Sequence, residues 1–443
     1  MVRGGVGHFV PNRRNIAPQS DRTFCTKVAG GHRVVLFLGF HWWVGSEYAA
    51  GSLLHVFSAL LKLSVLSSIH PLFAYLDGEK IMSFNLPLCS PQRITLIREL
   101  YGIRKSELSM RLGVSARTIT CWELGLQAPS SGDVAALCRV FGVDPEFFEP
   151  GTDGVPVASG LPHFRSYRAG TQVAYRQAQA YVQVAQDLVR TLGGYVDFPA
   201  LHLPDIPADP ELAESIVPQM AAQQVRHEWG LGDGPISHLL RVVENHGICA
   251  VFAPFEFAGL GSYSVFNGVT PLIVLDPACG NYYRQRFNLA HELGHLVMHP
   301  DAEPGNKVIE AQADAFAAEL LAPSEVLHDE LPTRMDGAGW LKLKELKERW
   351  GVSMKVLLDK AYAVGRLTEE GYRAGLKSLS RSGWKLLEPG AISGIEEPSL
   401  IPHALELLGD MGISLEEVRE RSRVPQGYFG VMAARRPLLP VRA

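Results

Sequence analysis

The chain has 443 residues, of which 47% are hydrophobic and 20% charged, and its formal net charge at pH 7 is −4. This length allows two or three domains, and the composition is that of an ordinary globular protein. A charge so near balance excludes attraction of the whole chain to nucleic acid or anionic lipid, so any DNA binding must come from a local basic patch.

The six cysteines are scattered along the chain and include no C-x-x-C pair. This pattern does not indicate a disulfide framework. We expect thiols in a reducing compartment, and therefore a cytoplasmic protein.

Residues 1–81 are first basic and then strongly apolar. The uncharged runs between Glu47, Lys62 and Asp77 are 14 residues each, which is too short to span a bilayer. The segment lacks the clear small-residue cleavage site of a signal peptide. We interpret 1–81 as an upstream extension, or a disordered or apolar segment, before a natural start at Met82, and we do not expect a membrane partner.

Short helical patterns with tight turns follow in residues 91–147. Ser106 is predicted to cap one helix, and Gly113-Val114 predicts a tight turn after it. Ser115 is predicted to cap a second helix, with Trp122 on its inward side. The run 91–123 has six basic and three acidic residues, which is a modest local positive bias.

The V-S-x-x-T-I-x-x-W-E core of this segment resembles the phage-repressor-like XRE family of helix-turn-helix domains. The resemblance implies a five-helix domain over 82–150 whose second motif helix enters the major groove of double-stranded operator DNA. Arg117 matches the best position for reading a guanine, and Lys105 matches a phosphate-contacting position. The positions that match the DNA-facing surface are Ser115, Ala116, Arg117, Thr118, Thr120 and Cys121. Some domains of this family bind protein partners instead of DNA.

Residues 164–195 have alanines and apolar side chains at helical spacing, which predicts one long helix that ends at Gly193-Gly194. The following stretch, LHLPDIPADP, contains prolines that a helix does not accommodate. We therefore expect a helical linker over 151–210. Beyond it, three β-rich runs at 248–255, 262–266 and 272–276 lie among helical patterns.

The segment FNLAHELGHLVMH at 287–299 carries the sharpest chemical signal. Residues four apart share a helix face, so His291 and His295 can converge on one metal ion. Glu292 lies beside them and is expected to be the general base that takes a proton from the attacking water. This is the H-E-x-x-H arrangement of zinc peptidases.

A third ligand is expected because catalytic zinc usually takes three protein ligands. Glu310 is the candidate, in the helical run EAQADAFAAELL. Asp314, one turn later, could accept the second ring N–H of a ligating histidine. His299 lies two turns from His291, too far to share the ion, and is expected at the end of the helix.

The two motifs together resemble the ImmA/IrrE family of metallopeptidases over roughly 220–345. The resemblance implies a zincin-like fold, zinc (with manganese as the alternative), and cleavage of helix-turn-helix repressors. By this likeness His291, His295 and Glu310 match metal ligands and Glu292 the general base. It also implies a small sheet whose edge receives an extended substrate.

A donor that stabilises the transition-state oxyanion is also needed. The residues near the motif that could supply it are Tyr263, Tyr282, Tyr283, Arg284 and Arg286. The sequence does not distinguish among them, and for Arg286 a structural salt bridge is at least as good an interpretation.

Residues 346–443 contain a second G-V-S turn between helical patterns, without a basic face. We interpret them as a helical accessory region that follows the metallopeptidase domain (211–345). No internal repeat is evident in the sequence.

The sequence thus predicts an α+β, mainly helical protein, with a repressor-like DNA-binding domain, a zincin-like domain with a small sheet, and a helical C-terminal region. The predicted function is a DNA-binding transcriptional regulator whose zinc-dependent endopeptidase cleaves a repressor-type protein, with a homodimer left open. One alternative is a transcription factor whose metal site is structural or sensory and catalytically silent. Another is the antitoxin or immunity component of a toxin–antitoxin or mobile-element pair.

Overall fold

The computed structural model describes residues 89–150, 171–204, 206, 217–266, 270–299, 306–384, 388–390, 392 and 394–438, together with three two-residue strands. Two of these strands, β1 (Lys27–Val28) and β2 (Gly31–His32), pair with each other; the rest of the expected upstream extension lies outside the described residues. Among the described helices, none is both long and apolar enough to cross a membrane.

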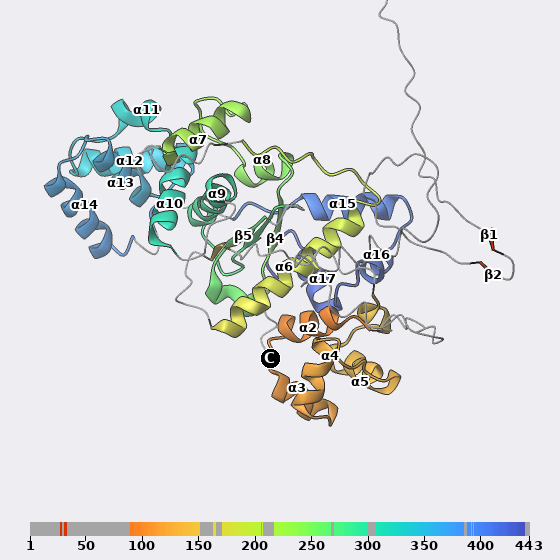
Figure 1. Cartoon of the computed structure of the whole chain (residues 1–443). Helices are drawn as coiled ribbons and strands as arrows, with labels where there is room; N and C mark the ends of the chain where they lie inside the picture. Colours follow the sequence, from red (N-terminus) through yellow and green to blue (C-terminus); the bar gives the residue numbers. More distant parts are fainter. Residues whose placement is uncertain are drawn as a thin grey trace, which may run out of the picture. The chain divides into compact units, whose positions relative to one another are not determined.

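A four-stranded sheet lies at the centre of the described part of 83–443, with strand order β3-β5-β6-β4 (Figure 1). Its members are β3 (His163–Phe164), β4 (Cys249–Phe252), β5 (Tyr263–Val265) and β6 (Leu272–Leu275). β4 and β6 are parallel, whereas β5 is antiparallel to β6 and β3. The three β-rich runs of the sequence are therefore confirmed as β4, β5 and β6.

Apolar side chains lie on both faces of β4 and β6, because alternate residues of these two strands enter different cores. Cys249 and Val251 of β4 belong to a first core, which also contains the helix-turn-helix segment. Ala250 and Phe252 belong to a second core, which also contains the helix of the H-E-x-x-H motif. The sheet is thus the partition between two cores.

The predicted helix-turn-helix is confirmed as a run of helices ending in a 3-10 turn. They are α2 (Pro91–Leu100), α3 (Lys105–Leu112), α4 (Ala116–Glu123), α5 (Ser131–Phe141) and η1 (Pro145–Phe148). Ser115 caps α4 as predicted, accepting a hydrogen bond from the Thr118 amide. The predicted cap at Ser106 is wrong: the N-cap of α3 is Arg104, two residues earlier, and Ser106 lies inside the helix.

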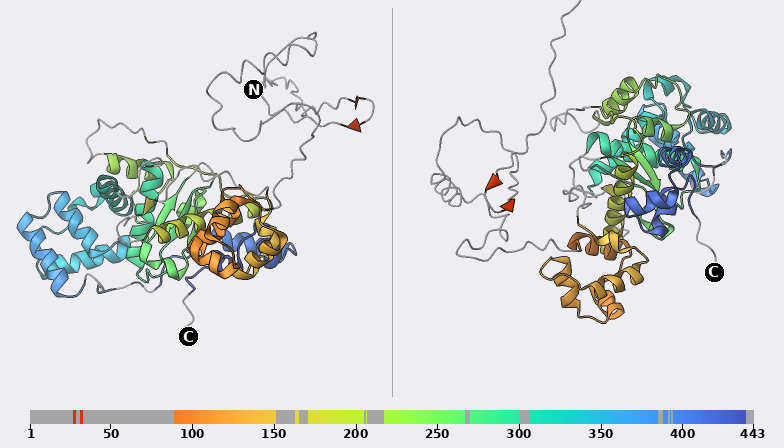
Figure 2. Two further views of the ribbon diagram at one scale, coloured as in Figure 1. Left: turned by 60° about the horizontal axis from the view of Figure 1, so that its bottom comes forward. Right: turned by 90° about the vertical axis from the view of Figure 1, so that its right-hand side faces the viewer.

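The long helix α6 (Gln172–Leu192) joins the helix-turn-helix segment to the sheet (Figures 1 and 2). At one contact the Arg93 guanidinium of α2 lies 2.7 Å from the Asp187 carboxylate of α6, and both side chains are buried. At another, the Tyr181 hydroxyl donates to the carbonyl oxygen of Phe252 in β4 at 2.6 Å. One helix therefore contacts both the helix-turn-helix segment and the sheet.

The predicted end of α6 is confirmed at Gly193, but the predicted start at residue 164 is wrong. His163–Phe164 is a strand, and α6 begins after Thr171, whose side chain accepts a hydrogen bond from the Ala174 amide. The N-cap side chain satisfies a backbone donor that a helix leaves without an internal partner, which fixes the start there.

The helices that form the second core lie on the other side of the sheet. They are α7 (Val217–Glu228), α8 (Leu239–Asn245), α9 (Tyr282–Met298), α10 (Lys307–Leu321), α11 (Ser324–Leu327), α12 (Gly337–Trp350), α13 (Met354–Ala363) and α14 (Glu369–Arg381). Two 3-10 turns, η2 (Phe255–Leu260) and η3 (His328–Glu330), complete the connections. α9 and α10 pack closely against each other.

The expected accessory region 346–443 divides between the two cores. α13 and α14 belong to the second core, with α9 and α10. The last three helices, α15 (Leu400–Asp410), α16 (Leu415–Ser422) and α17 (Gln426–Met432), belong to the first core and contact α6 or β4.

The last three helices repeat the architecture of α2–α4, a repeat that the sequence did not reveal. α3 and α16 both have eight residues, and each ends at a residue with left-handed backbone, Gly113 or Arg423. In both cases one valine and one cap residue follow before the next helix begins. The equivalent inward positions are buried in both units: Leu108 and Val418, Ile119 and Phe429, Trp122 and Met432.

Candidate metal centre and nucleic-acid interface

The helix α9 carries the H-E-x-x-H motif in a fully buried position. It begins after Asn281, whose side chain accepts a hydrogen bond from the Arg284 amide at 3.0 Å. Leu289, Leu293 and Leu296 fix the helix in the second core. The imidazoles of His291 and His295 are 0% exposed, so they lie between α9 and its neighbours and not in solvent.

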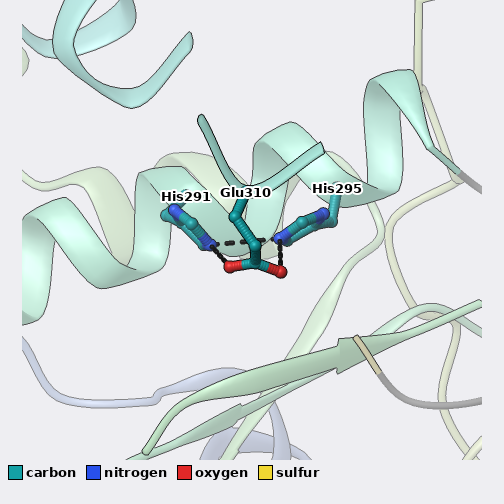
Figure 3. A group of neighbouring side chains, drawn as sticks. All are labelled: His291, His295 and Glu310. Atoms are coloured by element: carbon teal, nitrogen blue, oxygen red, sulfur yellow. Dashed lines mark hydrogen bonds and ion pairs between the residues drawn. The ribbon is translucent and has the colours of Figure 1, made fainter. Parts of the chain in front are cut away.

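Three predicted ligand residues converge on one point (Figure 3). The Nε2 atoms of His291 and His295 are 3.0 Å apart. The Glu310 carboxylate of α10 reaches between them, with Oε2 3.4 Å from His291 Nε2 and Oε1 3.6 Å from His295 Nε2. Zinc bonds of about 2.0–2.1 Å in a tetrahedron place ligand atoms about 3.3 Å apart, so the three residues fit such an ion.

Asp314 lies one turn after Glu310 and contacts the other side of the first imidazole. Its Oδ1 is 2.8 Å from His291 Nδ1. A carboxylate at this distance favours a proton on Nδ1, which leaves the Nε2 lone pair directed toward His295 and Glu310. The predicted pairing of Asp314 with a motif histidine is thus present in the geometry.

His299 is the C-cap of α9, at the helix end where the sequence placed it. Its Nε2 lies 2.8 Å from Gln312 Oε1 of α10. Burial lowers the pKa of His299, and the contact with Gln312 acts in the opposite direction. His299 therefore helps to join α9 to α10 and is not in the group of three convergent ligands.

Glu292 faces the sheet, where it meets a residue that sequence analysis did not single out. The hydroxyl of Ser264, in β5, donates to Glu292 Oε2 at 2.8 Å, and both residues are buried. Tyr263 and Val265 enter the first core, so the serine between them points to the α9 side. The available signal was a serine between two apolar side chains in the run SYSVF, at the position where the strand alternation turns it to the other face.

Three of the candidate oxyanion donors lie in, or bond to, parts of the protein other than the proposed metal site. Tyr263 belongs to the first core, on the far face of the sheet from α9. The Tyr283 hydroxyl donates to the Gly390 carbonyl oxygen at 2.9 Å. Arg286 forms a buried ion pair with Glu396, which is the structural alternative that the sequence left open.

A buried ion pair holds α10 in place beyond the ligand Glu310. Glu319 of α10 accepts from the Lys360 ammonium of α13 at 2.6 Å and from the Ser324 hydroxyl at 2.6 Å. Burial would raise the pKa of Glu319, but the charge of Lys360 and these hydrogen bonds outweigh it, so the pKa lies below its ordinary value. The charged pair therefore fixes α10 relative to α13.

The candidate nucleic-acid surface consists of α4, as far as Cys121, and its cap Ser115. Ser115, Ala116 and Arg117 are exposed, and Thr118, Thr120 and Cys121 are half-buried. The hydroxyls of Ser115 and Thr118 are 2.8 Å apart, and the Thr120 hydroxyl donates to the Ala116 carbonyl at 3.1 Å. Arg117 is the only basic residue of α4.

Lys105, the expected phosphate contact, is less available than the sequence suggested. Its ammonium lies 2.8 Å from Glu123 at the end of α4, and 38% of its side chain is exposed. Glu123 also pairs with Arg98 of α2. The positive charge of Lys105 is thus partly compensated, although the side chain still reaches the surface.

Two family models match this chain. Residues 243–362 match a peptidase family described as IrrE N-terminal-like domain, and residues 94–148 match a family described as helix-turn-helix. A search of curated proteins returned no match. The predicted fusion is confirmed: the chain joins a helix-turn-helix of the DNA-binding type to a metallopeptidase-like domain.

Proposed function

We propose that this chain is a DNA-binding transcriptional regulator whose peptidase domain uses zinc to cleave a repressor-type protein. The observation that carries the proposal is the convergence of His291, His295 and Glu310 beside the buried carboxylate of Glu292. The two family matches support a DNA-binding part and a peptidase part in one polypeptide. We assign the first to 82–150 and the second to 211–345.

The three convergent residues would hold the metal. Two imidazole nitrogens and one carboxylate are the donor set of many catalytic zinc sites, and such sites leave one position for a non-protein ligand. Zinc is therefore the ion we propose, with manganese as the alternative. Asp314, through His291 Nδ1, would orient the first ligand.

The chain's own residues would perform the proton transfers. When bound, the metal polarises the scissile carbonyl and makes water a stronger nucleophile. Glu292 accepts the proton of the attacking water and passes it to the departing amine. Ser264 holds Glu292 Oε2 by a hydrogen bond and so keeps the carboxylate in one orientation.

The location of the protein is part of the same proposal. Five cysteines are unpaired in the described part of the chain: Cys89, Cys121, Cys138, Cys249 and Cys279. Free thiols are typical of a reducing compartment, and they favour the cytoplasm.

The test compares the wild-type chain with Glu292→Gln, which keeps the size of the side chain and removes its basicity. Each protein is loaded with zinc or manganese and incubated with a peptide library and with helix-turn-helix repressors encoded nearby. Mass spectrometry then identifies new termini. We expect discrete cuts by the wild type and a rate lower by about 10²–10⁴ for Glu292→Gln.

Metal content and operator binding of both proteins serve as controls and should be equal. A catalytically silent metal site, the main alternative, predicts no new termini with either protein. Equal cutting by both proteins would instead assign the base to another residue.

A further inference from the structure

The outer edge of strand β5 is occupied by the chain itself. β5 has β6 on one side and β3 on the other. β3 pairs antiparallel with β5, with His163 opposite Ser264 and Phe164 opposite Tyr263. β3 belongs to the connection between η1, where the helix-turn-helix ends, and α6.

β5 is the strand of the sheet that touches the proposed catalytic residue. Ser264 donates its hydroxyl to Glu292, and its backbone is paired with His163. β5 also packs against α9, the helix that carries both histidines. A peptide backbone that pairs with the outer edge of β5 therefore runs beside the proposed site.

Extended peptides bind to sheet edges by adding a strand, and main-chain hydrogen bonds give such complexes most of their affinity. One edge accepts one strand at a time. β3 is thus in the place that an extended substrate needs, and in the antiparallel orientation.

We propose that β3 is an internal competitor for the substrate-binding edge of the peptidase domain, so that a substrate strand must displace His163–Phe164 before it is cut. The proposal rests on the proposed function, because it names the regulation of the same site. It limits the substrate to an extended, unfolded segment of a protein that can pair with β5.

The pairing is weak enough to be displaced. β3 and β5 are paired at only two residue positions, and each net hydrogen bond contributes modestly to stability. The competitor is nevertheless covalently attached, so its effective concentration at the edge is high. A free peptide of modest affinity would not displace it, whereas a protein substrate with further contacts would.

The displacement does not require the DNA-binding segment to leave. On one side of β3, α2 is held to α6 by the buried pair of Arg93 and Asp187. On the other side, α6 is the next element of the chain. The two described elements that flank β3 in the chain, η1 and α6, thus contribute to one core, and the displacement leaves that core in place.

The test uses the full chain with His163→Pro and Phe164→Pro, which removes both amide donors of β3. The matched control carries Ala158→Pro and Ser159→Pro, in the same connection and outside β3. All proteins also carry Glu292→Gln, so that a bound peptide is not cut. The probe is a fluorescent synthetic peptide with the sequence of residues 159–167, and its binding is measured by fluorescence anisotropy.

We expect the β3 variant to bind the peptide at least about tenfold more tightly than the wild type and the control do. In hydrogen–deuterium exchange, amides of β5 should exchange faster in the β3 variant, whereas those of β6 should not change. Equal peptide affinity and equal β5 exchange in all three proteins would overturn the proposal. A second variant, His163→Gly with Phe164→Gly, repeats the test if the prolines disturb folding.

The same proteins with Glu292 restored separate this proposal from the proposed function. Tighter peptide binding without any cleavage would keep the internal competitor and remove the peptidase function. Cleavage at equal rates by the wild type and the β3 variant, with equal peptide affinity, would keep the peptidase function and remove the internal competitor. Cleavage of the wild-type chain within 163–164 would make β3 a substrate and also overturn the proposal.

Discussion

Gly294 of α9 lies against the ring of Phe316 of α10 so closely that a Cβ atom on Gly294 would be 2.9 Å from the ring carbon Cδ1. Glycine at this position of the H-E-x-x-H motif therefore sets the distance between the two helices that carry the proposed ligands. The contact lies within the second core, where the ring of Phe316 is fully buried.

We expect Gly294→Ala to weaken metal binding, because the added methyl group moves α10, and with it Glu310, away from the histidines. Overpacking of this kind costs typically about 1–3 kcal/mol of stability. Metal affinity by chelator competition and the melting temperature are the measurements. Gly409→Ala is the control, since a Cβ on Gly409 in α15 would meet no atom within 4 Å. Unchanged metal affinity in Gly294→Ala would show that the helices tolerate the methyl group.

The metal ligands can be tested with two histidines of the same helix region. His295→Ala should lose the ion or bind it much more weakly, because one of three ligands is removed. His299→Ala should keep it, since His299 contacts Gln312 and lies outside the convergent group. Metal stoichiometry of the purified proteins by mass spectrometry is the measurement. A stoichiometric ion in the double variant His291→Ala, His295→Ala would contradict the site.

Substitutions of Arg117 and of Lys105 should affect DNA binding in different ways. Arg117→Ala is expected to relax base preference at one position by about 1–3 kcal/mol, whereas Lys105→Ala should weaken binding to all sequences and reduce the salt slope by about one. Gel shifts with the protein's own promoter region at several salt concentrations provide the measurement. Arg373→Ala, an exposed residue of α14 with the same charge change, is the control. Equal effects of all three variants would argue against α4 as the reading helix.

The buried pair of Arg93 and Asp187 should matter for DNA binding although Asp187 lies outside 82–150. Asp187→Ala leaves the Arg93 guanidinium buried without its carboxylate, which typically costs about 3–5 kcal/mol. Arg190→Ala removes only the half-exposed neighbour of Asp187 and should cost much less. Chemical denaturation and operator binding are both measured. Wild-type behaviour of Asp187→Ala in both would show that 82–150 is stable by itself.

Acid should destabilise the protein through Glu319. Its pKa in the folded protein is below the ordinary value of 4.5, so its ion pair stabilises the fold above that pH. This stabilisation is lost as the pH falls through the folded-state pKa. Glu319→Gln should be less stable at neutral pH and should show a weaker decline in acid than the wild type does. Glu330→Gln, whose ion pairs lie at the surface, is the control and should have a smaller effect. Identical pH profiles of Glu319→Gln and the wild type would contradict this role.

The sequence predicted those features that are set by residues close together in the chain. Helical periodicity places His291 and His295 on one face whatever surrounds them, and the convergence of their Nε2 atoms follows from that spacing. The cap at Ser115 and the end of α6 at Gly193 are likewise local properties of the backbone.

The contacts that the sequence missed all join distant segments. Ser264 meets Glu292, and Gly294 meets Phe316, only because the sheet and α10 pack against α9. The pairing of Lys105 with Glu123 depends on how α3 packs against α4. The sequence did not reveal that α16 and α17 repeat the arrangement of α3 and α4. The two units bury equivalent positions but use different residue types there, and Arg423 takes the place of Gly113.

The position of the sheet between two cores has a thermodynamic consequence. β4 and β6 each supply side chains to both cores, so neither core can open without exposing apolar residues of strands that the other core needs. The two parts should therefore melt in a single transition. A ligand that binds only the folded state stabilises everything that unfolds with its site. A metal ion held by α9 and α10 would thus raise the melting temperature of the helix-turn-helix on the opposite face, and operator DNA would strengthen retention of the metal.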